Sequence, residues 1–302
     1  MATLPNRRVG FTLIELLVVI SLIGTLAALS VGAFMRVRAG QTKVASETTL
    51  QKLNTALDNR WKVILESVKE DHKKNQGQWP NALIAANGNP DAAESLLLYA
   101  KAKNELPMTF AEAKAPTTVT TAYGTISLPP KAVFNTLPIS TATSPEESGA
   151  CFYLAVLSNA GGGAMLDSDG LQQQSTDYTG AGWNVSARLF KDAWGTPIAF
   201  VRMAYTPELN APPYIKAGQL RDPNDPAGKL PAIMSALAWG QLTANTPPFA
   251  GIPGTYPAAT QNFVPTLVSA GPNKLWEPSI FAGSNNDNLL SYRLRREGGK
   301  GD

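Results

Sequence analysis

The sequence has very few of the side chains that many enzymes and metal centres use. Cys151 is the only cysteine among the 302 residues, which excludes an intrachain disulfide and a cysteine-rich metal site. His72 is the only histidine, and it lies in a charged stretch that predicts a solvated surface position. A histidine-based triad or zinc site is therefore not expected, and the sequence argues against an enzyme.

The sequence also lacks a strong excess of charge of either sign. It has 26 basic and 23 acidic residues, a formal net charge of +3, and no long block of like charges. Proteins that bind nucleic acid electrostatically need a basic surface that neutralises many phosphates. This balance argues against nucleic acid as a partner.

Charge is almost missing between Phe11 and Phe34, where Glu15 is the only charged residue. As a helix, this stretch of about 24 residues is long enough to span a hydrocarbon core of about 30 Å. It is longer than the apolar region of about 7–15 residues in a secretory signal peptide, and the helical pattern continues beyond it. We therefore expect a single-pass anchor, with the short N-terminal leader inside and the bulk of the chain exported.

Glu15 is the exception within this anchor. A charged side chain in the apolar part of a membrane helix costs roughly 2.5–3.5 kcal/mol on insertion scales. No lysine or arginine lies between Phe11 and Met35. The nearest positive group that can be made is a free amine on Phe11, released by a cut after Gly10. We expect Glu15 to pair with such an amine, in its own chain or in a neighbouring one.

The stretch Gly10-Phe11-Thr12-Leu13-Ile14-Glu15 resembles the processing site of type IV prepilins and of the pseudopilins of type II secretion systems. A short basic leader precedes it and an apolar run follows it. The resemblance implies that a prepilin peptidase cuts after Gly10 and N-methylates Phe11. It also implies that Glu15 pairs with the Phe11 amine of an adjacent subunit during assembly. Residues 1–10 are then the leader and residues 11–35 the transmembrane half of a helix.

Proline is absent between Pro5 and Pro80, so nothing in this long segment must break a helix. We predict one helix from Phe11 to near Lys73, roughly 95 Å long. Residues 36–76 form its amphipathic half, with apolar side chains at steps of three and four: Leu50, Leu53, Leu57, Trp61, Ile64 or Leu65, and Val68. This stripe covers little more than two heptads, which favours packing on a globular head over a coiled coil.

The rest of the chain predicts a head of mixed structure. Residues 91–103 read as a helix, residues 110–114 as a short helical turn, and residues 151–157 as a helix or a buried strand. We expect residues 77–190 to be a large variable insertion and residues 191–302 to form a C-terminal β-sheet with its loops. The predicted class is α+β, in which a long N-terminal transmembrane helix packs on a small antiparallel sheet, as in pilins.

Three turns in the last third of the sequence carry a second resemblance. Residues 192–197 form a turn that enters a strand, residues 267–274 a strand that ends in a Gly-Pro turn, and residues 285–294 a polar turn before a final short strand. In this order they resemble the C-terminal part of major pseudopilins, where calcium commonly sits between the last two loops.

The resemblance makes Ser269, Asn273 and Asp287 the candidate calcium ligands. Asn273 stands where aspartate is usual, which removes one anionic ligand from a site that needs six to eight oxygens. Two interpretations therefore stay open: a calcium site, or a turn held by hydrogen bonds alone. No other cofactor is expected.

The leading functional hypothesis is a structural pseudopilin of a type II secretion-like system. It would reside in the bacterial inner membrane with its head in the periplasm, and assemble with other pilin-like subunits on an inner-membrane platform. The alternative is a type IV pilus subunit, major or minor, for adhesion, motility or DNA uptake. Many such pilins close a C-terminal loop with two cysteines, which one cysteine cannot do. An anchored enzyme is the third hypothesis.

Overall fold

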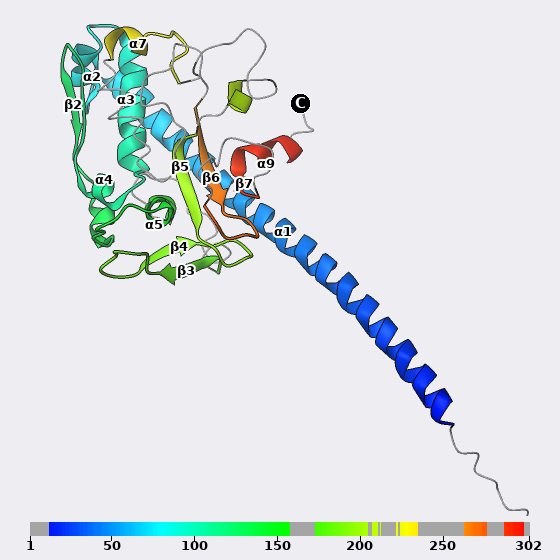
Figure 1. Cartoon of the computed structure of the whole chain (residues 1–302). Helices are drawn as coiled ribbons and strands as arrows, with labels where there is room; N and C mark the ends of the chain where they lie inside the picture. The colour runs from blue at the N-terminus through cyan, green and yellow to red at the C-terminus, as the bar shows by residue number, and fades with distance from the viewer. Residues whose placement is uncertain are drawn as a thin grey trace, which may run out of the picture. The chain divides into compact units, whose positions relative to one another are not determined.

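The computed structural model describes residues 12–157, 173–204, 207–210, 212, 222, 224–234, 263–276 and 287–298. Gly10 and Phe11, the predicted processing residues, lie outside this part of the chain. The structure has a long apolar N-terminal helix and small antiparallel sheets (Figure 1). This confirms the predicted α+β class. The chain divides into two compact units, Met1–Ala45 and Ser46–Asp302.

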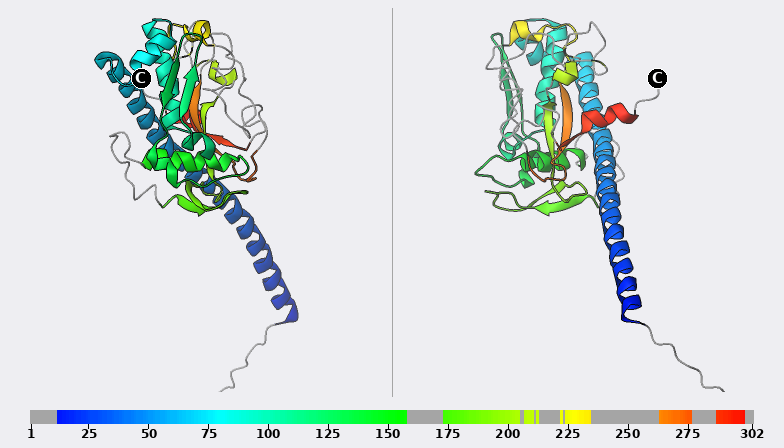
Figure 2. Two further views of the ribbon diagram at one scale, coloured as in Figure 1. Left: turned by 90° about the vertical axis from the view of Figure 1, so that its left-hand side faces the viewer. Right: turned by 45° about the vertical axis from the view of Figure 1, so that its right-hand side comes forward.

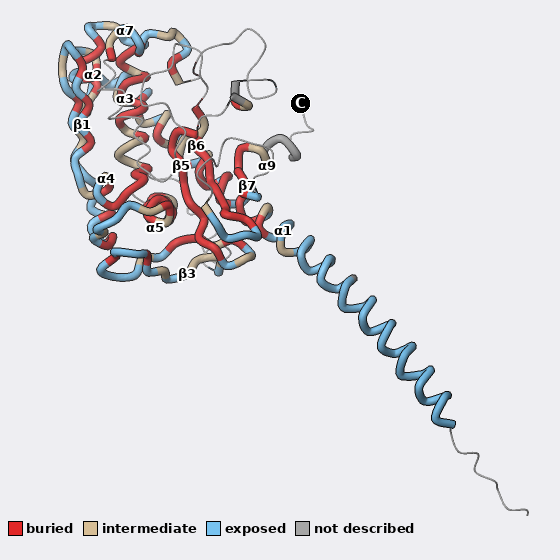
Figure 3. Tube along the Cα trace, in the orientation of Figure 1, coloured by how far each residue is buried: buried red, intermediate tan, exposed pale blue. Residues whose placement is uncertain are grey.

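The first unit contains the beginning of helix α1, which spans Leu13–Lys74. From Thr12 to Gln41, every residue whose burial is described is exposed (Figure 3). By its length and composition α1 is able to cross a membrane. The hydroxyls of Ser21, Thr25 and Ser30 donate to backbone carbonyls three or four residues earlier, at 2.8–2.9 Å. Polar groups in lipid must be satisfied within the protein, so these hydroxyls suit a membrane segment.

In the second unit, the remainder of α1 buries the predicted apolar stripe. Leu50, Leu53 and Leu57 are fully buried, and Ile64 and Val68 nearly so. They join one hydrophobic cluster with residues from the following helices and strands. The prediction that this half of the helix packs on the head is confirmed.

Ion pairs hold the same part of α1 beside α3 (Pro90–Glu105). The Arg60 guanidinium pairs with Glu105, and the Lys101 ammonium lies 2.7 Å from the Asp71 carboxylate. The side chains of both pairs are mostly buried, so they fix the position of α3 along α1 more firmly than exposed pairs would.

Helix α1 ends within a few residues of the predicted stop. Asn75 and Gly77 follow it with positive φ angles of 47° and 61°, in the left-handed region that often closes a helix. His72, in the last turn, is half exposed and its ring stacks on Trp79 with the centroids 3.8 Å apart. The only histidine therefore packs against an aromatic ring at the helix end.

Other short helices surround the core of the head: α2 (Trp79–Ala85), α4 (Phe110–Lys114), η1 (Ala132–Thr136), α5 (Pro145–Leu157), η2 (Pro207–Asn210), α7 (Leu230–Ile233) and α9 (Ser291–Gly298). Helices α3 and α4 confirm the predictions for residues 91–103 and 110–114. Helix α5 shows that residues 151–157 are helical. Its Cys151 is fully buried, and burial raises the pKa of the thiol well above its usual value.

The strands form antiparallel pairs. Two hairpin sheets join β1 (Thr117–Thr120) to β2 (Thr125–Leu128) and β3 (Ser175–Tyr178) to β4 (Ala187–Phe190). The third sheet has the order β5-β6-β7, formed by Ile198–Ala204, Val264–Ser269 and Leu289–Leu290. In its register Ile198 lies opposite Ser269, and Val268 opposite Leu290.

Strand β5 is buried along its whole length, and α5 crosses its beginning (Figure 2). The Phe200 amide donates to the Ser148 hydroxyl at 2.9 Å. A side chain at Gly149 would collide with the Ile198 carbonyl oxygen, so only glycine allows α5 this close. Helix α5 therefore covers the edge of the sheet at the start of β5. This prevents a strand of another chain from pairing there.

Arg202 links β5 to α4 inside the head. Its guanidinium forms two hydrogen bonds to the Glu112 carboxylate, at 3.0 and 3.1 Å, and a third to the Leu106 carbonyl at 3.0 Å. The Arg202 side chain is fully buried. A buried charge is costly unless it is paired, so this pair fixes how α4 packs on the sheet.

The sequence predicts residues 285–294 as a polar turn leading to a final short strand, and they contain a two-residue strand followed directly by a helix. Strand β7 ends at Leu290, and α9 begins at Ser291. The Ser291 hydroxyl accepts the Leu267 amide proton at 3.0 Å. This hydrogen bond takes the place of the next backbone bond between β6 and β7. Tyr292 is buried from within the helix. Alternating polar and apolar residues over so short a segment fit a strand and a helical turn equally well.

Candidate functional site

The described chain begins with a capping arrangement at the start of α1. The Glu15 Oε2 atom accepts the Thr12 amide proton at 2.9 Å and the Thr12 hydroxyl proton at 2.8 Å. In return, the Glu15 amide donates to the Thr12 hydroxyl at 3.3 Å. Thr12 precedes the first helical residue, Leu13, so the two residues form a capping box.

The capping box gives Thr12 a role beyond its place in the processing motif. The spacing of three residues between Thr12 and Glu15 is the signal in the sequence that indicates such a box. The box satisfies backbone donors that a helix start otherwise leaves unpaired. It uses Oε2 of Glu15, whereas Oε1 accepts no hydrogen bond from any described residue. One carboxylate oxygen therefore remains accessible to a further donor.

A second cluster of polar side chains lies where the predicted C-terminal turns meet. The Asp192 Oδ1 atom accepts the backbone amide protons of Trp194 at 3.0 Å and Thr196 at 2.8 Å. Its Oδ2 atom accepts the Ser269 hydroxyl proton at 2.6 Å. The sequence predicts a turn at Asp192, but no local pattern indicates its link to Ser269, which lies 77 positions away.

The same turn contacts helix α1. The Ala193 amide donates to the Ser46 hydroxyl at 3.0 Å, and Ser46 is fully buried. Asp192 itself is 4% exposed, and burial raises the pKa of its carboxyl group above the usual value. Its hydrogen bonds act in the opposite direction and favour the ionised form. The cluster joins α1, the entry to β5 and the end of β6.

The three candidate calcium ligands have different surroundings. Ser269 is fully buried and its hydroxyl is committed to Asp192. The Asn273 side chain accepts the Leu275 amide proton at 2.9 Å, within its own turn. Asp287 is exposed, and its backbone carbonyl lies so close to Gly271 that a side chain there would overlap it. Gly271 has a φ of 73°, which suits glycine.

The two loops thus meet through direct backbone contact at Gly271 and Asp287. Calcium takes six to eight oxygen ligands, and these three residues offer fewer in their present roles. No group of three or more acidic, histidine or cysteine side chains suited to a metal occurs among the described residues. Residues 277–286, between the loops, lie outside the described part of the chain. Calcium binding here stays a prediction.

Comparison with known families gives one result. Residues 6–31 match the model of the prokaryotic N-terminal methylation motif, a range that contains Gly10, Phe11 and Glu15. Comparisons with curated proteins and with solved structures gave no match. The motif coincides with the apolar start of α1 and its capping box. The chain carries the N-terminal signature of type IV prepilin-like proteins, which indicates a structural protein of the pilin type.

Proposed function

We propose that this chain is a structural pseudopilin subunit of a type II secretion-like system. A prepilin peptidase cuts after Gly10 and N-methylates Phe11, and the mature subunit waits in the bacterial inner membrane with its head in the periplasm. Assembly with other pilin-like subunits on an inner-membrane platform then builds a periplasmic fibre. The match of residues 6–31 to the N-terminal methylation motif carries this proposal.

The capping box supports a role of Glu15 in assembly. Thr12 occupies Oε2 of the carboxylate, and Oε1 accepts nothing from the described residues. A carboxylate surrounded by lipid is costly until a cation neutralises it. The methylated amine of a neighbouring subunit is such a cation and can donate hydrogen bonds. Pairing between subunits then offsets the cost, so that a lone subunit in the membrane is less stable than an assembled one.

Two observations favour secretion over a pilus. Cys151 is buried in α5 and has no cysteine partner, so no disulfide closes the C-terminal loops. A hydrogen bond from Ser269 to Asp192 ties the strand end to the preceding turn instead. The turns joined in this way are those that resemble major pseudopilins. A type IV pilus subunit for adhesion, motility or DNA uptake is the alternative.

Two further expectations belong to this proposal. Calcium would bind with Ser269, Asn273 and Asp287 as its candidate ligands, and chelation would then lower the unfolding temperature of the wild type but not of Asp287→Asn; with a turn held by hydrogen bonds alone, chelation would change neither. Residues 77–190 would be a variable insertion in the head of the subunit. Their buried side chains share one hydrophobic cluster with those of the C-terminal sheet.

The proposal is tested by deleting the gene and comparing the mutant with its parent strain. The proteins of the culture medium and the surface fibres are both measured. Loss of secreted proteins with intact surface fibres supports the secretion role. Loss of fibres, motility or DNA uptake with normal secretion supports the pilus alternative. Complementation with the wild-type gene must restore the lost trait, and Gly10→Val serves as the uncut control.

A further inference from the structure

Three basic residues follow the apolar run of α1 directly. Arg36, Arg38 and Lys43 come shortly after Met35, and all three are exposed. The sequence has no acidic residue between Glu15 and Glu47, so the stretch between these two residues carries only positive charge. Arg36, Arg38 and Lys43 together are called the basic collar below.

The two arginines of the collar have no partner among the residues that the structure describes. Neither guanidinium group forms a hydrogen bond or an ion pair there. The Thr42 hydroxyl donates to the Arg38 backbone carbonyl at 2.9 Å, a bond that leaves the Arg38 side chain uninvolved. Further along the same helix, Arg60 is paired with Glu105. Each collar guanidinium therefore presents its five donors to whatever surrounds this part of α1.

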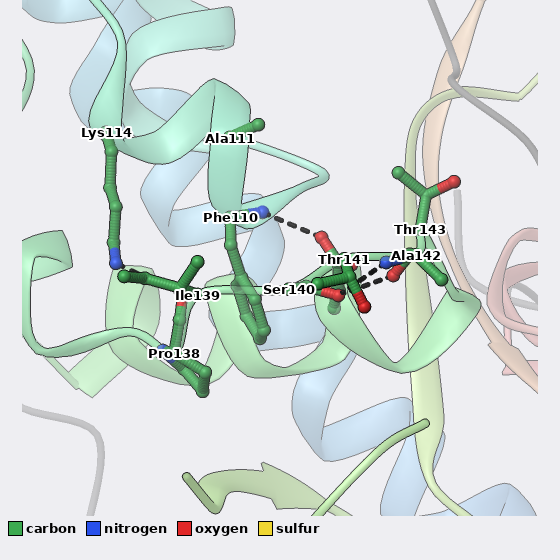
Figure 4. Close-up of a pocket in the computed structure, with 10 residues that line it drawn as sticks. Phe110, Ala111, Lys114, Pro138, Ile139, Ser140, Thr141, Ala142 and Thr143 are labelled. Carbon is green, nitrogen blue, oxygen red and sulfur yellow. Dashed lines mark hydrogen bonds between the residues drawn. The ribbon is translucent and has the colours of Figure 1, made fainter. Parts of the chain in front are cut away.

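The charged groups at a small pocket in the head are, by contrast, occupied. This pocket has a volume of about 200 Å³, with walls from α4, the segment 138–143 and the first turn of α5, as Figure 4 shows for the first two. The Lys114 ammonium donates to the Pro138 carbonyl at 3.1 Å, and the buried Glu147 carboxylate accepts the Phe110 amide proton at 2.9 Å. Both groups stabilise the head itself.

The collar surrounds α1 and does not mark a single face of it. An α-helix turns by about 100° per residue, so Arg38 projects about 160° away from Arg36, and Lys43 returns to within about 20° of Arg36. The two arginines differ by only about 3 Å in height along the axis. A protein that binds one face of the helix would meet only part of this set. A layer of lipid head groups surrounds a helix at one depth and meets all of it.

The depth of the collar matches that layer. Residues 13–35 of α1 form an apolar helical run of roughly 34 Å, slightly longer than a hydrocarbon core of about 30 Å. Arg36 and Arg38 then lie within about 5 Å of the end of the run, where the phosphates of the lipids are found. Lys43 lies about 12 Å beyond it, and its long stem can extend back towards the interface.

We propose that the basic collar binds anionic phospholipids, with Arg36 and Arg38 donating to the phosphates of their head groups. This inference rests on the proposed membrane position of α1 and adds the class of lipid around it. Each basic residue close to an anionic membrane surface is worth about a fivefold gain in local concentration. A cut after Gly10 removes Arg7 and Arg8, so that the collar holds the only basic residues beside the span in the mature chain.

The test measures which lipids gather at the collar of the full chain in phospholipid vesicles. A fluorophore is attached at Gly40→Cys, because Gly40 is exposed and a side chain there meets nothing within 4 Å, whereas Cys151 is fully buried. Phosphatidylglycerol and phosphatidylcholine with the same nitroxide-labelled acyl chain are compared as quenchers at equal mole fraction. We expect about fivefold enrichment of the anionic lipid at the fluorophore. Equal quenching by the two lipids would overturn the inference.

Two sets of substitutions locate the effect. Replacing all three collar residues by glutamine keeps long side chains that favour a helix, and should bring the two lipids to equal quenching. The matched control is Lys52→Gln with Lys62→Gln and Lys69→Gln, which removes the same charge from exposed positions further along α1. The control should keep the enrichment. Enrichment that survives in the collar variant, or that disappears in the control as well, would contradict the assignment to the collar.

The same experiment separates this inference from the proposed function. If neither lipid quenches the fluorophore, α1 is not inserted, and both the lipid binding and the proposed membrane position are wrong. Equal quenching by both lipids overturns the lipid binding alone. If the collar instead contacts other subunits, the wild type shows equal quenching and the collar variant is depleted from cross-linked fibres, which also overturns the inference.

Discussion

Ser269 and Asp192 share a hydrogen bond of 2.6 Å that joins the end of β6 to the turn before β5. Both residues are buried, and the carboxylate also organises its own turn through two backbone amides. Ser269 additionally accepts the Gly271 amide proton at 3.2 Å. The bond therefore couples the geometry of two loops that are distant in sequence.

We predict that Ser269→Ala lowers the free energy of unfolding by about 1–3 kcal/mol. The substitution leaves a buried carboxylate oxygen without its donor, which costs more than the loss of an exposed hydrogen bond. Chemical denaturation of the full chain in detergent, followed by circular dichroism of the head, measures the effect. Ser127→Ala, at an exposed position of β2, is the control and should change little. Equal stability of the two variants would show that the bond contributes nothing.

A second prediction separates the two roles of Glu15. Glu15→Ala should insert in the membrane and be cut, but should assemble poorly into fibres. Glu15→Gln keeps a side chain that can close the capping box with Thr12, while it removes the charge. If pairing with a neighbouring amine drives assembly, both variants fail, as measured by the amount of each subunit in sheared or cross-linked fibres.

Thr12→Ala provides the complementary variant. It removes the capping hydroxyl and keeps the carboxylate, so assembly should persist with a helix start weakened by about 1 kcal/mol. Normal assembly of Glu15→Gln together with failure of Thr12→Ala would show that capping matters and that the charge does not.

A third prediction concerns processing. Gly10→Val should block the cut, because a branched side chain replaces the small residue before the predicted cleavage site. The uncut protein retains residues 1–10 and has no methyl group on Phe11. Mass spectrometry of the membrane fraction distinguishes it from the mature wild type, whose first residue should be N-methylated Phe11. Detection of a Gly10→Val chain that begins at Phe11 would place the specificity of the cut elsewhere.

A fourth prediction follows from Asp222. Its carboxylate accepts the Tyr99 hydroxyl proton, and burial raises its pKa from 3.8 to about 6. Between these values the native state binds more protons than the unfolded state, so the contribution of this group to stability falls as the pH rises. Once this carboxyl group is ionised, above about pH 6, the free energy of unfolding is lower by roughly 3 kcal/mol than at a pH where the group is protonated in both states.

The prediction is checked by comparing Asp222→Asn with the wild type across this pH range. The wild type should lose stability relative to the variant as the pH rises from about 3.5 to 7. Asp91→Asn, at an exposed position in the first turn of α3, is the control. If the difference in the free energy of unfolding between the wild type and Asp222→Asn does not change with pH, the raised pKa of Asp222 is contradicted.

The features that the sequence predicts well are those with local signals. The long apolar run and the stripe from Leu50 to Val68 predict α1 through their periodicity alone. The Trp-Gly-Thr-Pro turn predicts the entry to β5, because Gly195 supplies the positive φ angle that the turn requires. The prepilin-type motif is equally local, since all its residues are neighbours.

Other features depend on contacts between distant residues. The Asp192–Ser269 bond and the pairing of Arg202 with Glu112 join positions separated by 77 and 90 residues. No local pattern encodes such pairs. Glu147 reads as an ordinary acidic residue in a first helical turn, and only the packing of α4 and the segment 138–143 encloses it. The start of α9 at Ser291 is hidden from local patterns in the same way, because the Leu267 amide that its hydroxyl accepts lies 24 positions away.

The burial of Cys151 has a practical consequence for studying assembly. A fully buried thiol with a raised pKa reacts slowly with maleimides and with oxidants under native conditions. The wild-type chain is therefore already a silent background for thiol chemistry. Single cysteines introduced at exposed positions, such as Ile84 or Ile139, can receive a spin label or a cross-linker selectively. Neighbouring subunits of the proposed fibre can then be mapped without first replacing a core residue.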